Sequence, residues 1–190
     1  SMDMEISDPE QKALVGDPNT TQLDADGKPV KTTRLTVARA AIEKFVHDGD
    51  YLAIGGFGAN RTPIAACHEI LRQGRKHMGF AGHTSTHDFE ILCAGEVFDK
   101  CDIAYIIGLE ARGLSNCARK YMQSGKVEIC EWTNYALAAR LRAAAAGVPF
   151  ALTRNMMGTD TFTYSGGKIV ECPFTGKRFV AQPALYPDIS

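Results

Sequence analysis

The sequence predicts an α/β fold: an open, mostly parallel sheet with helices on both faces, followed by a β-hairpin near the C-terminus. Short apolar runs alternate with helix-like segments from about residue 36 to residue 153, and glycine or polar turns separate them. Beyond Gly158 two strand-like runs flank a Pro-Phe-Thr-Gly turn instead. Because strands joined by helices pair in parallel through right-handed crossovers, the alternation predicts the parallel sheet.

Composition narrows the class of protein. The chain has 190 residues, 45% of them hydrophobic, which suits one globular domain. A net charge of −1 argues against a nucleic-acid binder. No apolar run approaches the ~18 residues of a membrane helix, and the acidic, polar start is unlike a secretory signal. We therefore expect a cytoplasmic protein with no nucleic-acid or membrane partner.

Residues 1–34 differ from the rest, because they are rich in Pro, Gly and Asp and poor in large apolar side chains. They predict an N-terminal arm or tail, and residues 35–190 predict the α/β domain. Helices are expected over 36–47, between Pro63 and Gly74, over 87–94 and 115–123, and from Thr133 or Asn134 to 146. Strands are expected over 51–54, 78–81, 101–107, 127–130 and 149–153, and the hairpin over 168–171 and 178–181.

The cysteines show no sign of metal or disulfide chemistry. None are spaced as Cys-x-x-Cys, no histidine stands at zinc-like spacing to two of them, and most have apolar neighbours. The pattern predicts reduced, mostly buried thiols and no metal site. The cysteines are Cys67, Cys93, Cys101, Cys117, Cys130 and Cys172.

Ligands of open α/β sheets bind beyond the carboxyl ends of the strands, so the loops at that edge matter most. These loops cover residues 55–61, 82–87, 131–134 and 154–160. In the first, Gly55 and Gly56 follow a strand directly, and their exposed N–H groups can stabilise an oxyanion or a phosphate. Neither the dinucleotide glycine pattern nor a P-loop is present. A purely structural turn remains the alternative.

The longer string at 48–57, Asp-Gly-Asp-Tyr-Leu-Ala-Ile-Gly-Gly-Phe, resembles the signature of family I CoA-transferases, and Pro63 falls in register with it. Arg61 stands where the general signature has Gly, but glutaconate CoA-transferase A (alpha) subunits look similar there. Other stretches that resemble that branch are 68–74, 145–150, 158–160, 172–176 and 180–184. The resemblance covers about residues 36–188.

The resemblance implies an enzyme that moves CoA from an acyl-CoA to a carboxylic acid, through a thioester on a glutamate. In two-subunit members the nucleophilic glutamate belongs to the B-type chain, so this chain would hold no catalytic nucleophile. Coenzyme A would be a substrate, and no cofactor or metal would be needed. The A-type chain would contribute the Gly-Gly-Phe loop and the facing wall of the site, and a B-type subunit would be its partner.

Candidate carboxylates in this chain need separate consideration. Glu96 and Glu128 fit solvated positions, whereas Glu110 and Glu131 follow strands and could face the site. None of them lies in a motif that resembles the family's nucleophile.

Other candidate site residues each have a structural alternative. Arg61 could bind a carboxylate through a bidentate pair, or it could cap the next helix or bridge to a second chain. Phe57 could contact the substrate or pack into the core. Asn134 could bind substrate, although a helix N-cap is its commoner role. The candidates are Gly55, Gly56, Phe57, Asn60 and Arg61 in the substrate loop, and His83, Thr84, Glu131, Asn134, Arg154, Thr159 and Asp160 for substrate binding.

Two other functions remain open at this point: part of a CoA-thioester hydrolase on the same fold, and a non-catalytic metabolite-binding module. The family's A-type chains would continue into another strand after residue 188. We therefore expect a chain that is short or truncated relative to the family and that forms part of a larger assembly.

Overall fold

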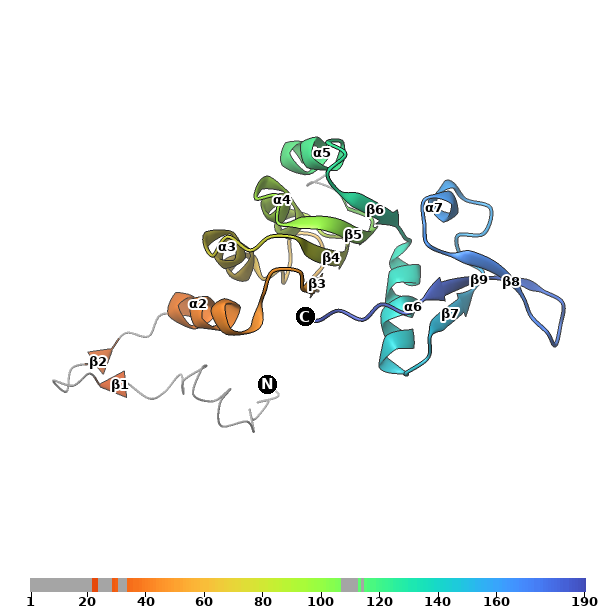
Figure 1. Cartoon of the computed structure of the whole chain (residues 1–190), viewed down its shortest axis with the longest axis horizontal. Coiled ribbons are helices and arrows are strands. Elements are labelled where there is room, and N and C mark those ends of the chain that lie inside the picture. Colours follow the sequence, from red (N-terminus) through yellow and green to blue (C-terminus); the bar gives the residue numbers. More distant parts are fainter. Residues whose placement is uncertain (1–21, 24–28, 31–33, 107–112, 114) are drawn as a thin grey trace.

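The computed structural model describes residues 22–23, 29–30, 34–106, 113 and 115–190, and it contains a parallel sheet and a separate antiparallel sheet (Figure 1). The parallel sheet has the order β3-β4-β5-β6 and the antiparallel sheet the order β7-β9-β8. The strands of the first are β3 (Tyr51–Ile54), β4 (Met78–His83), β5 (Phe98–Ala104) and β6 (Glu128–Glu131). Those of the second are β7 (Phe150–Thr153), β8 (Lys168–Glu171) and β9 (Arg178–Pro183). A further short pair joins β1 (Gln22–Leu23) to β2 (Pro29–Val30).

Helices cover both faces of the parallel sheet, as predicted (Figure 1). One face carries α2 (Arg34–Phe45), α3 (Ile64–Arg72), α4 (His87–Ala94) and α5 (Asn116–Met122). The other carries α6 (Asn134–Ala145), and the short α7 (Asp160–Thr163) lies between β7 and β8 in the chain. Strand residues alternate between the two cores: Leu52 and Ile54 face α2–α5, whereas Tyr51 and Ala53 face α6.

An aromatic cluster fills the first core. The ring centroids of Phe80, Phe89 and Phe98 lie 5.2 to 5.4 Å apart, and Tyr121 meets Phe98 edge-on at 5.7 Å. The three phenylalanines are 1% exposed or less, so each contributes about 2–3 kcal/mol of hydrophobic stabilisation. This cluster joins β4, α4, β5 and α5 in one core.

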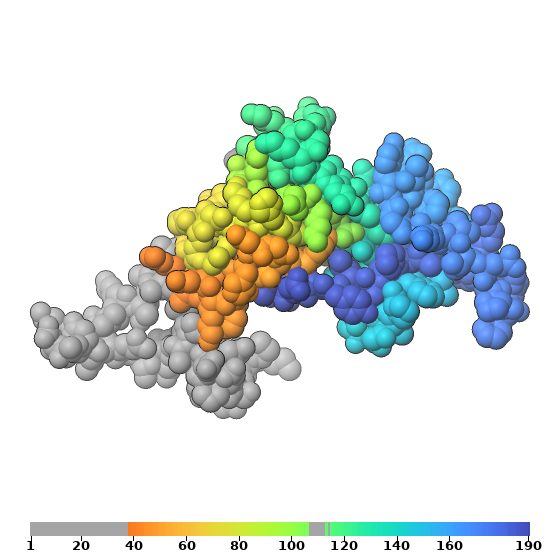
Figure 2. Space-filling model, in the orientation of Figure 1, coloured from red at the N-terminus to blue at the C-terminus, as the bar shows by residue number. Residues whose placement is uncertain are grey.

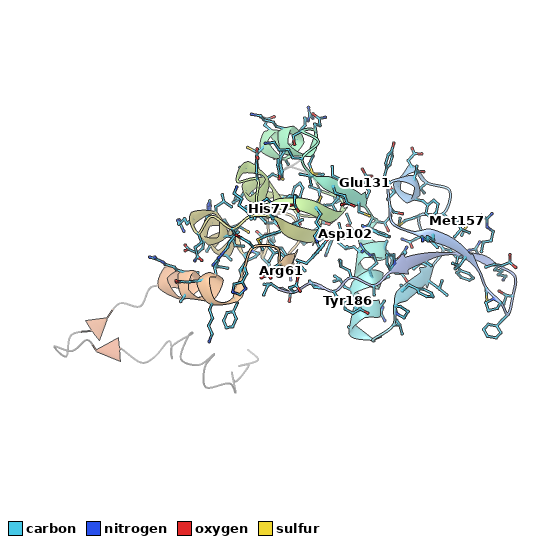
Figure 3. All side chains as sticks on the ribbon, in the orientation of Figure 1. Arg61, His77, Asp102, Glu131, Met157 and Tyr186 are labelled. Carbon is cyan, nitrogen blue, oxygen red and sulfur yellow. The ribbon has the colours of Figure 1, made fainter. Side chains whose placement is uncertain are left out.

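A buried polar cluster ties the second core together. Asp102 of β5 accepts hydrogen bonds from Tyr51, from Trp132 (2.5 Å) and from Arg140 of α6, and Figure 3 shows it between the sheet and that helix. The Arg140 guanidinium also lies 4.0 Å over the Trp132 ring and donates to the carbonyl of Pro183 (2.8 Å). Because Arg140 is 5% exposed, its charge is compensated by Asp102 rather than by water.

Two predicted strands differ in the structure. The strand expected over residues 101–107 runs from Phe98 to Ala104, because Tyr105 takes a left-handed backbone conformation (φ +56°) that ends it. The strand expected over 149–153 is present as β7 but does not join the parallel sheet. It pairs antiparallel with β9, because the predicted hairpin β8–β9 turns back and places Val180–Pro183 opposite β7.

The C-terminal residues return to the parallel sheet. The N–H of Ala53 donates to the carbonyl of Ile189 (2.8 Å), and the N–H of Tyr51 donates to the Asp188 carboxylate (2.7 Å). Leu52 and Ile189 form a parallel bridge, so the segment covers part of the β3 edge. Figure 2 shows this segment in blue between the orange of the β3 region and the cyan of α6 and β7.

The thiols are free, and half of them are buried: Cys67, Cys93 and Cys101. Burial raises the pKa of Cys67 and of Cys101 to about 12 and raises that of Cys93 as well. Cys130 and Cys172 are half-buried and Cys117 is exposed, so the expectation that most thiols lie in the core holds for three only. None of the helices in the described ranges is long and apolar enough to cross a membrane.

Candidate functional site

The carboxyl ends of the parallel strands lie level with one another. Ile54 pairs with Gly82, Gly82 with Ile103, and Ile103 with Glu131, so these residues form one row across the sheet. The loops that follow β3, β4, β5 and β6 therefore leave the sheet along one edge, and three of the candidate loops of the sequence meet there.

The glycine loop after β3 is a tight, internally bonded turn. Phe57 and Asn60 exchange two backbone hydrogen bonds of 3.0 Å, and the N–H of Gly58 donates to the carbonyl of Thr84 (2.8 Å). These N–H groups are therefore already used. Within the described residues, the N–H groups of Gly56 and Ala59 have no such backbone bond, which leaves them free to meet an anionic ligand.

Gly56 has a strict steric role in this turn. Its φ is +120°, and a Cβ there would lie 3.0 Å from both the carbonyl oxygen of Arg61 and Cγ2 of Thr62. Gly55, in contrast, has open space at the Cβ position. Only the second glycine of the pair is therefore required by the shape of the loop.

Thr84 connects three parts of the site. Its N–H donates to the carbonyl of Ala104 at the end of β5 (2.9 Å), and its own carbonyl accepts from Gly58. Its hydroxyl accepts from the side-chain amide of Asn134 (3.2 Å) and lies 3.3 Å from Nδ1 of His83. The Thr86 hydroxyl also donates to the carbonyl of Gly58 (2.7 Å), so the loops after β3 and β4 form one unit.

Three of the six non-glycine residues with a left-handed backbone in the described part of the chain lie at this edge. Arg61 (φ +58°), Thr84 (φ +50°) and Tyr105 (φ +56°) follow three adjacent strands, and none of them is glycine. Such conformations cost about 1–3 kcal/mol each and persist where the surroundings enforce them, which is common at binding sites. Tyr105, 55% exposed, is a candidate that the sequence did not single out, because no local pattern marks a strained tyrosine.

Phe57 does not plug the core. Its side chain is 55% exposed and meets the His83 ring edge-on, with 6.5 Å between the ring centroids. Asn60 and Arg61 are exposed as well. The loop therefore presents an aromatic ring, an amide and a guanidinium outward, where a ligand or a second chain can reach them.

Thr133 and Asn134 make different hydrogen bonds at the start of α6. The Thr133 hydroxyl accepts from the N–H of Ala136 (3.1 Å) and is the N-cap. The expectation that Asn134 would more commonly be a cap is wrong here, because Asn134 is the first helical residue and its amide is turned to Thr84. Asn134 is thus part of the site's framework.

The loop after β7 also reaches this framework, through a residue that sequence reasoning missed. The side-chain amide of Asn155 donates to the Thr133 hydroxyl (2.6 Å), and the buried Gln182 amide donates to Asn155 (3.1 Å) and to Thr153 (2.9 Å). Only the tertiary arrangement of β7, β9 and α6 could reveal these contacts, because the residues are far apart in sequence.

The remaining predicted residues lie on either side of that loop. Arg154 and Asp160 are exposed at the end of β7 and the start of α7. Thr159 caps α7, because its hydroxyl donates to the carbonyl of Met156 (2.7 Å) and accepts from the N–H of Phe162 (3.4 Å). Its hydroxyl is therefore occupied within the loop, although a role in binding stays a prediction.

The candidate carboxylates separate clearly. Glu131 is exposed at the carboxyl end of β6, and Figure 3 places it toward α7, where its N–H donates to the carbonyl of Tyr164 (3.0 Å). Glu128 begins β6, at the opposite edge of the sheet. Glu96 pairs with Lys126 at 2.8 Å, and those hydrogen bonds lower its pKa. Glu110 lies outside the described residues.

No three His, Cys, Asp or Glu side chains gather closely enough to hold a metal ion within the ranges the structure describes. Apart from the Glu131 carboxylate and the Tyr105 phenol, the groups available at the edge are backbone N–H groups, hydroxyls, amides, an imidazole and a guanidinium. These groups suit the binding of carboxylates, thioester carbonyls and phosphates.

Comparison with known proteins agrees with this arrangement. The family model described as Coenzyme A transferase matches residues 35–190, so the chain belongs to the coenzyme A transferase family. It is 33% identical over 160 residues to the A subunit of 3-oxoadipate CoA-transferase from Pseudomonas knackmussii, a match that covers 82% of this chain and 56% of that protein.

Solved structures share the fold. Glutaconate coenzyme A-transferase from Acidaminococcus fermentans superposes with a TM-score of 0.73 and 27% identity, covering 79% of this chain and 53% of that one. The decarboxylase AibA/AibB superposes with a TM-score of 0.72 and 31% identity, covering 79% of this chain and 58% of that one. The chain spans about half the length of the curated relatives it matches.

Proposed function

We propose that this chain is the A-type part of a two-subunit CoA-transferase that moves CoA from an acyl-CoA to a carboxylic acid. The main observation behind the proposal is the geometry of the glycine loop after β3, which is hydrogen-bonded to Thr84. It offers the free N–H groups of Gly56 and Ala59 beside the exposed Phe57 and Arg61. Support also comes from the relatives, whose names describe A-type chains of CoA-transferases.

The proposed chemistry divides between two chains. A glutamate carboxylate of the B-type chain attacks the acyl-CoA carbonyl, which releases CoA thiolate and leaves an acyl-glutamyl anhydride. The thiolate attacks the glutamyl carbonyl, giving a glutamyl-CoA thioester and the free donor acid. The acceptor carboxylate then attacks this thioester, which releases CoA thiolate and leaves an anhydride between the acceptor acid and the glutamate. The thiolate attacks the acceptor acyl carbonyl of that anhydride, which gives the new acyl-CoA and the free glutamate carboxylate.

In those steps, residues of this chain would bind and orient the substrates. The free amides of the glycine loop would hold the oxygen that becomes negative when each carbonyl is attacked. Arg61 would pair with the carboxylate of donor or acceptor, and His83, Thr84 and Asn134 would fix the loop that faces it. Coenzyme A enters as a substrate, and the chain needs no further cofactor for these roles.

The test is co-expression of this chain with a B-type chain, followed by transfer assays from acetyl-CoA to a panel of mono- and dicarboxylic acids. We expect transfer only with both chains present and a borohydride-sensitive CoA adduct on the B-type chain. Transfer by this chain alone would contradict the assignment of the nucleophilic glutamate to the B-type chain. Release of free CoA without an acceptor acid would indicate a hydrolase instead.

A decarboxylase is the second candidate, because the similarity to AibA/AibB is as close as that to glutaconate CoA-transferase. The same assays separate the two reactions: carbon dioxide release from an acyl-CoA bearing a free carboxylate, without CoA exchange, would favour decarboxylation. If the two-chain complex binds acyl-CoA but catalyses no reaction of it, the result would favour a metabolite-binding module over an enzyme.

A further inference from the structure

A buried polar network joins the antiparallel sheet to the start of α6. The Gln182 side chain of β9 is 0% exposed, and its amide donates to the Thr153 hydroxyl (2.9 Å) and to Oδ1 of Asn155 (3.1 Å). The Thr153 hydroxyl donates to the same Oδ1 atom. The Asn155 amide in turn donates to the Thr133 hydroxyl (2.6 Å). Asn155 is therefore held from β7 and β9 on one side and contacts the N-cap of α6 on the other.

The network continues to the glycine loop. The Thr133 hydroxyl is shared, because it accepts from Asn155 and also from the N–H of Ala136 (3.1 Å) as the cap of α6. The next residue, Asn134, donates to the Thr84 hydroxyl (3.2 Å), and the Thr84 carbonyl accepts from the N–H of Gly58 (2.8 Å). A path of hydrogen bonds, with one peptide link between Thr133 and Asn134, therefore runs from β9 to the glycine loop.

One atom of this network is buried without a partner. The side-chain oxygen Oε1 of Gln182 accepts no hydrogen bond from the described residues. An unpaired buried acceptor costs free energy, and an apolar side chain of similar shape would avoid that cost. Such a side chain could not donate to Asn155, however. What the glutamine provides at this position is therefore the orientation of the Asn155 side chain.

We propose that Asn155, held by Gln182, is a positioning residue for the transfer reaction. It fixes the first turn of α6 and, through Asn134 and Thr84, the conformation of the glycine loop. The inference rests on the proposed function of that loop. The same contacts hold the loop after β7, which carries the exposed Arg154. The antiparallel sheet thereby takes part in the site, although it contributes no strand to the parallel sheet.

The first test is the steady-state kinetics of transfer by the two-chain complex. Asn155→Ala should lower kcat by about 10-fold, because a displaced loop no longer fits the transition state. The KM for acyl-CoA should change by less than about 2-fold, since the lost interaction strengthens only in the transition state. Ser165→Ala is the matched control and should keep full activity. The Ser165 hydroxyl also makes two hydrogen bonds, to the carbonyl of Phe162 (2.8 Å) and from the N–H of Gly167 (3.1 Å), neither of which reaches α6.

Further variants distinguish positioning from a merely structural role. The double variant Asn155→Ala with Asn134→Ala should be within about 2-fold of the slower single variant, because both changes act on the same loop, whereas independent effects would multiply. Thr133→Ser keeps the hydroxyl and should retain nearly full kcat, whereas Thr133→Val should be as slow as N155A. Gln182→Met should lower kcat by about 3-fold to 10-fold. It should shift the urea midpoint by less than about 0.5 M, because it removes the unpaired oxygen together with the donor.

Hydrogen exchange of the chain gives a readout that does not depend on transfer. The amide of Gly58 should exchange about 10-fold faster in N155A than in S165A, because its bond to the Thr84 carbonyl opens more often. Equal exchange in these two variants, or losses of kcat that multiply in the double variant, would overturn the proposal. If the original two-chain complex shows no transfer, the proposed function fails, and the exchange of Gly58 still decides whether Asn155 positions the glycine loop.

Discussion

The side-chain amide of Asn134 donates a 3.2 Å hydrogen bond to the hydroxyl of Thr84, across 50 residues of sequence. This contact joins the first turn of α6 to the loop after β4, and the Thr84 carbonyl in turn accepts from the Gly58 N–H. The glycine loop is therefore positioned from α6, a helix that packs on the opposite face of the sheet from α2–α5. Its conformation depends on both cores of the parallel sheet.

We expect Asn134→Ala to lower kcat/KM of the two-chain enzyme by about 10-fold to 100-fold, because small displacements of a positioned loop have effects of that size. Since Asn134 is exposed, stability should fall by no more than about 1 kcal/mol. Asn134→Asp, which can accept from the Thr84 hydroxyl, should restore part of the activity. Asn116→Ala at the start of α5 is the control, and an N134A enzyme as active as this control would contradict the positioning role.

Gly56→Ala should lower the free energy of unfolding by about 1–3 kcal/mol, because its φ of +120° and two contacts at 3.0 Å oppose a Cβ. Gly55→Ala is the matched control, since nothing lies within 4 Å of that Cβ and its stability should change by about 0.5 kcal/mol or less. Urea unfolding followed by circular dichroism measures both. Equal effects at the two positions would show that the loop does not require Gly56 in particular.

Stability at alkaline pH should depend on Tyr51. Burial, and then the nearby Asp102 carboxylate, raise the pKa of this phenol above its ordinary value. The native state therefore keeps the proton when the unfolded chain loses it, so the stabilisation is complete below about pH 10 and declines as the pH rises further. The expected slope from this group is at most about 1.4 kcal/mol per pH unit.

Tyr51→Phe should make that alkaline slope shallower, as measured by urea unfolding between about pH 9 and pH 11. The absolute stability of the variant should also be lower, because Asp102 loses one of its donors. Tyr164→Phe, at a 64% exposed side chain, is the control for the loss of a surface phenol. An unchanged slope in Y51F would contradict the prediction.

Cys172 should be the most reactive thiol toward iodoacetamide at neutral pH. Hydrogen bonds from the Thr175 hydroxyl, and from the N–H groups of Phe174 and Thr175, lower its pKa. Peptide mapping by mass spectrometry should find it modified about 3-fold to 10-fold faster than Cys117, which is exposed. Cys67, Cys93 and Cys101 should react only on unfolding, because burial raises the pKa of each.

The Thr175 hydroxyl provides the matched test of that cause. Thr175→Ala should slow the modification of Cys172, whereas Thr175→Ser keeps the hydroxyl and should leave the rate nearly unchanged. If both variants react like the original chain, the hydroxyl does not stabilise the thiolate.

The local sequence predicted most helices and strands correctly where the hydrophobic periodicity was regular and Gly or Pro residues marked the ends of the segments. The helix over His87–Ala94, the strand over Tyr51–Ile54 and the hairpin of β8 and β9 are present where the pattern placed them. The partner of β7 was not predictable in this way, because a four-residue apolar run carries no information about which strand lies beside it. Tyr105 illustrates the same limit, since its left-handed conformation ends β5 without a local signal.

The sequence by itself determined the family, the alternation of strands and helices, and the loop that carries Gly55, Gly56 and Phe57, because these depend on residue order and local preference. The tertiary structure alone decided which groups of that loop are free. It turned Asn134 toward Thr84, used the N–H groups of Phe57, Gly58 and Asn60 internally, and left β7 with an open edge. Hydrogen-bond partners far apart in sequence are selected by packing, so only the folded chain could reveal them.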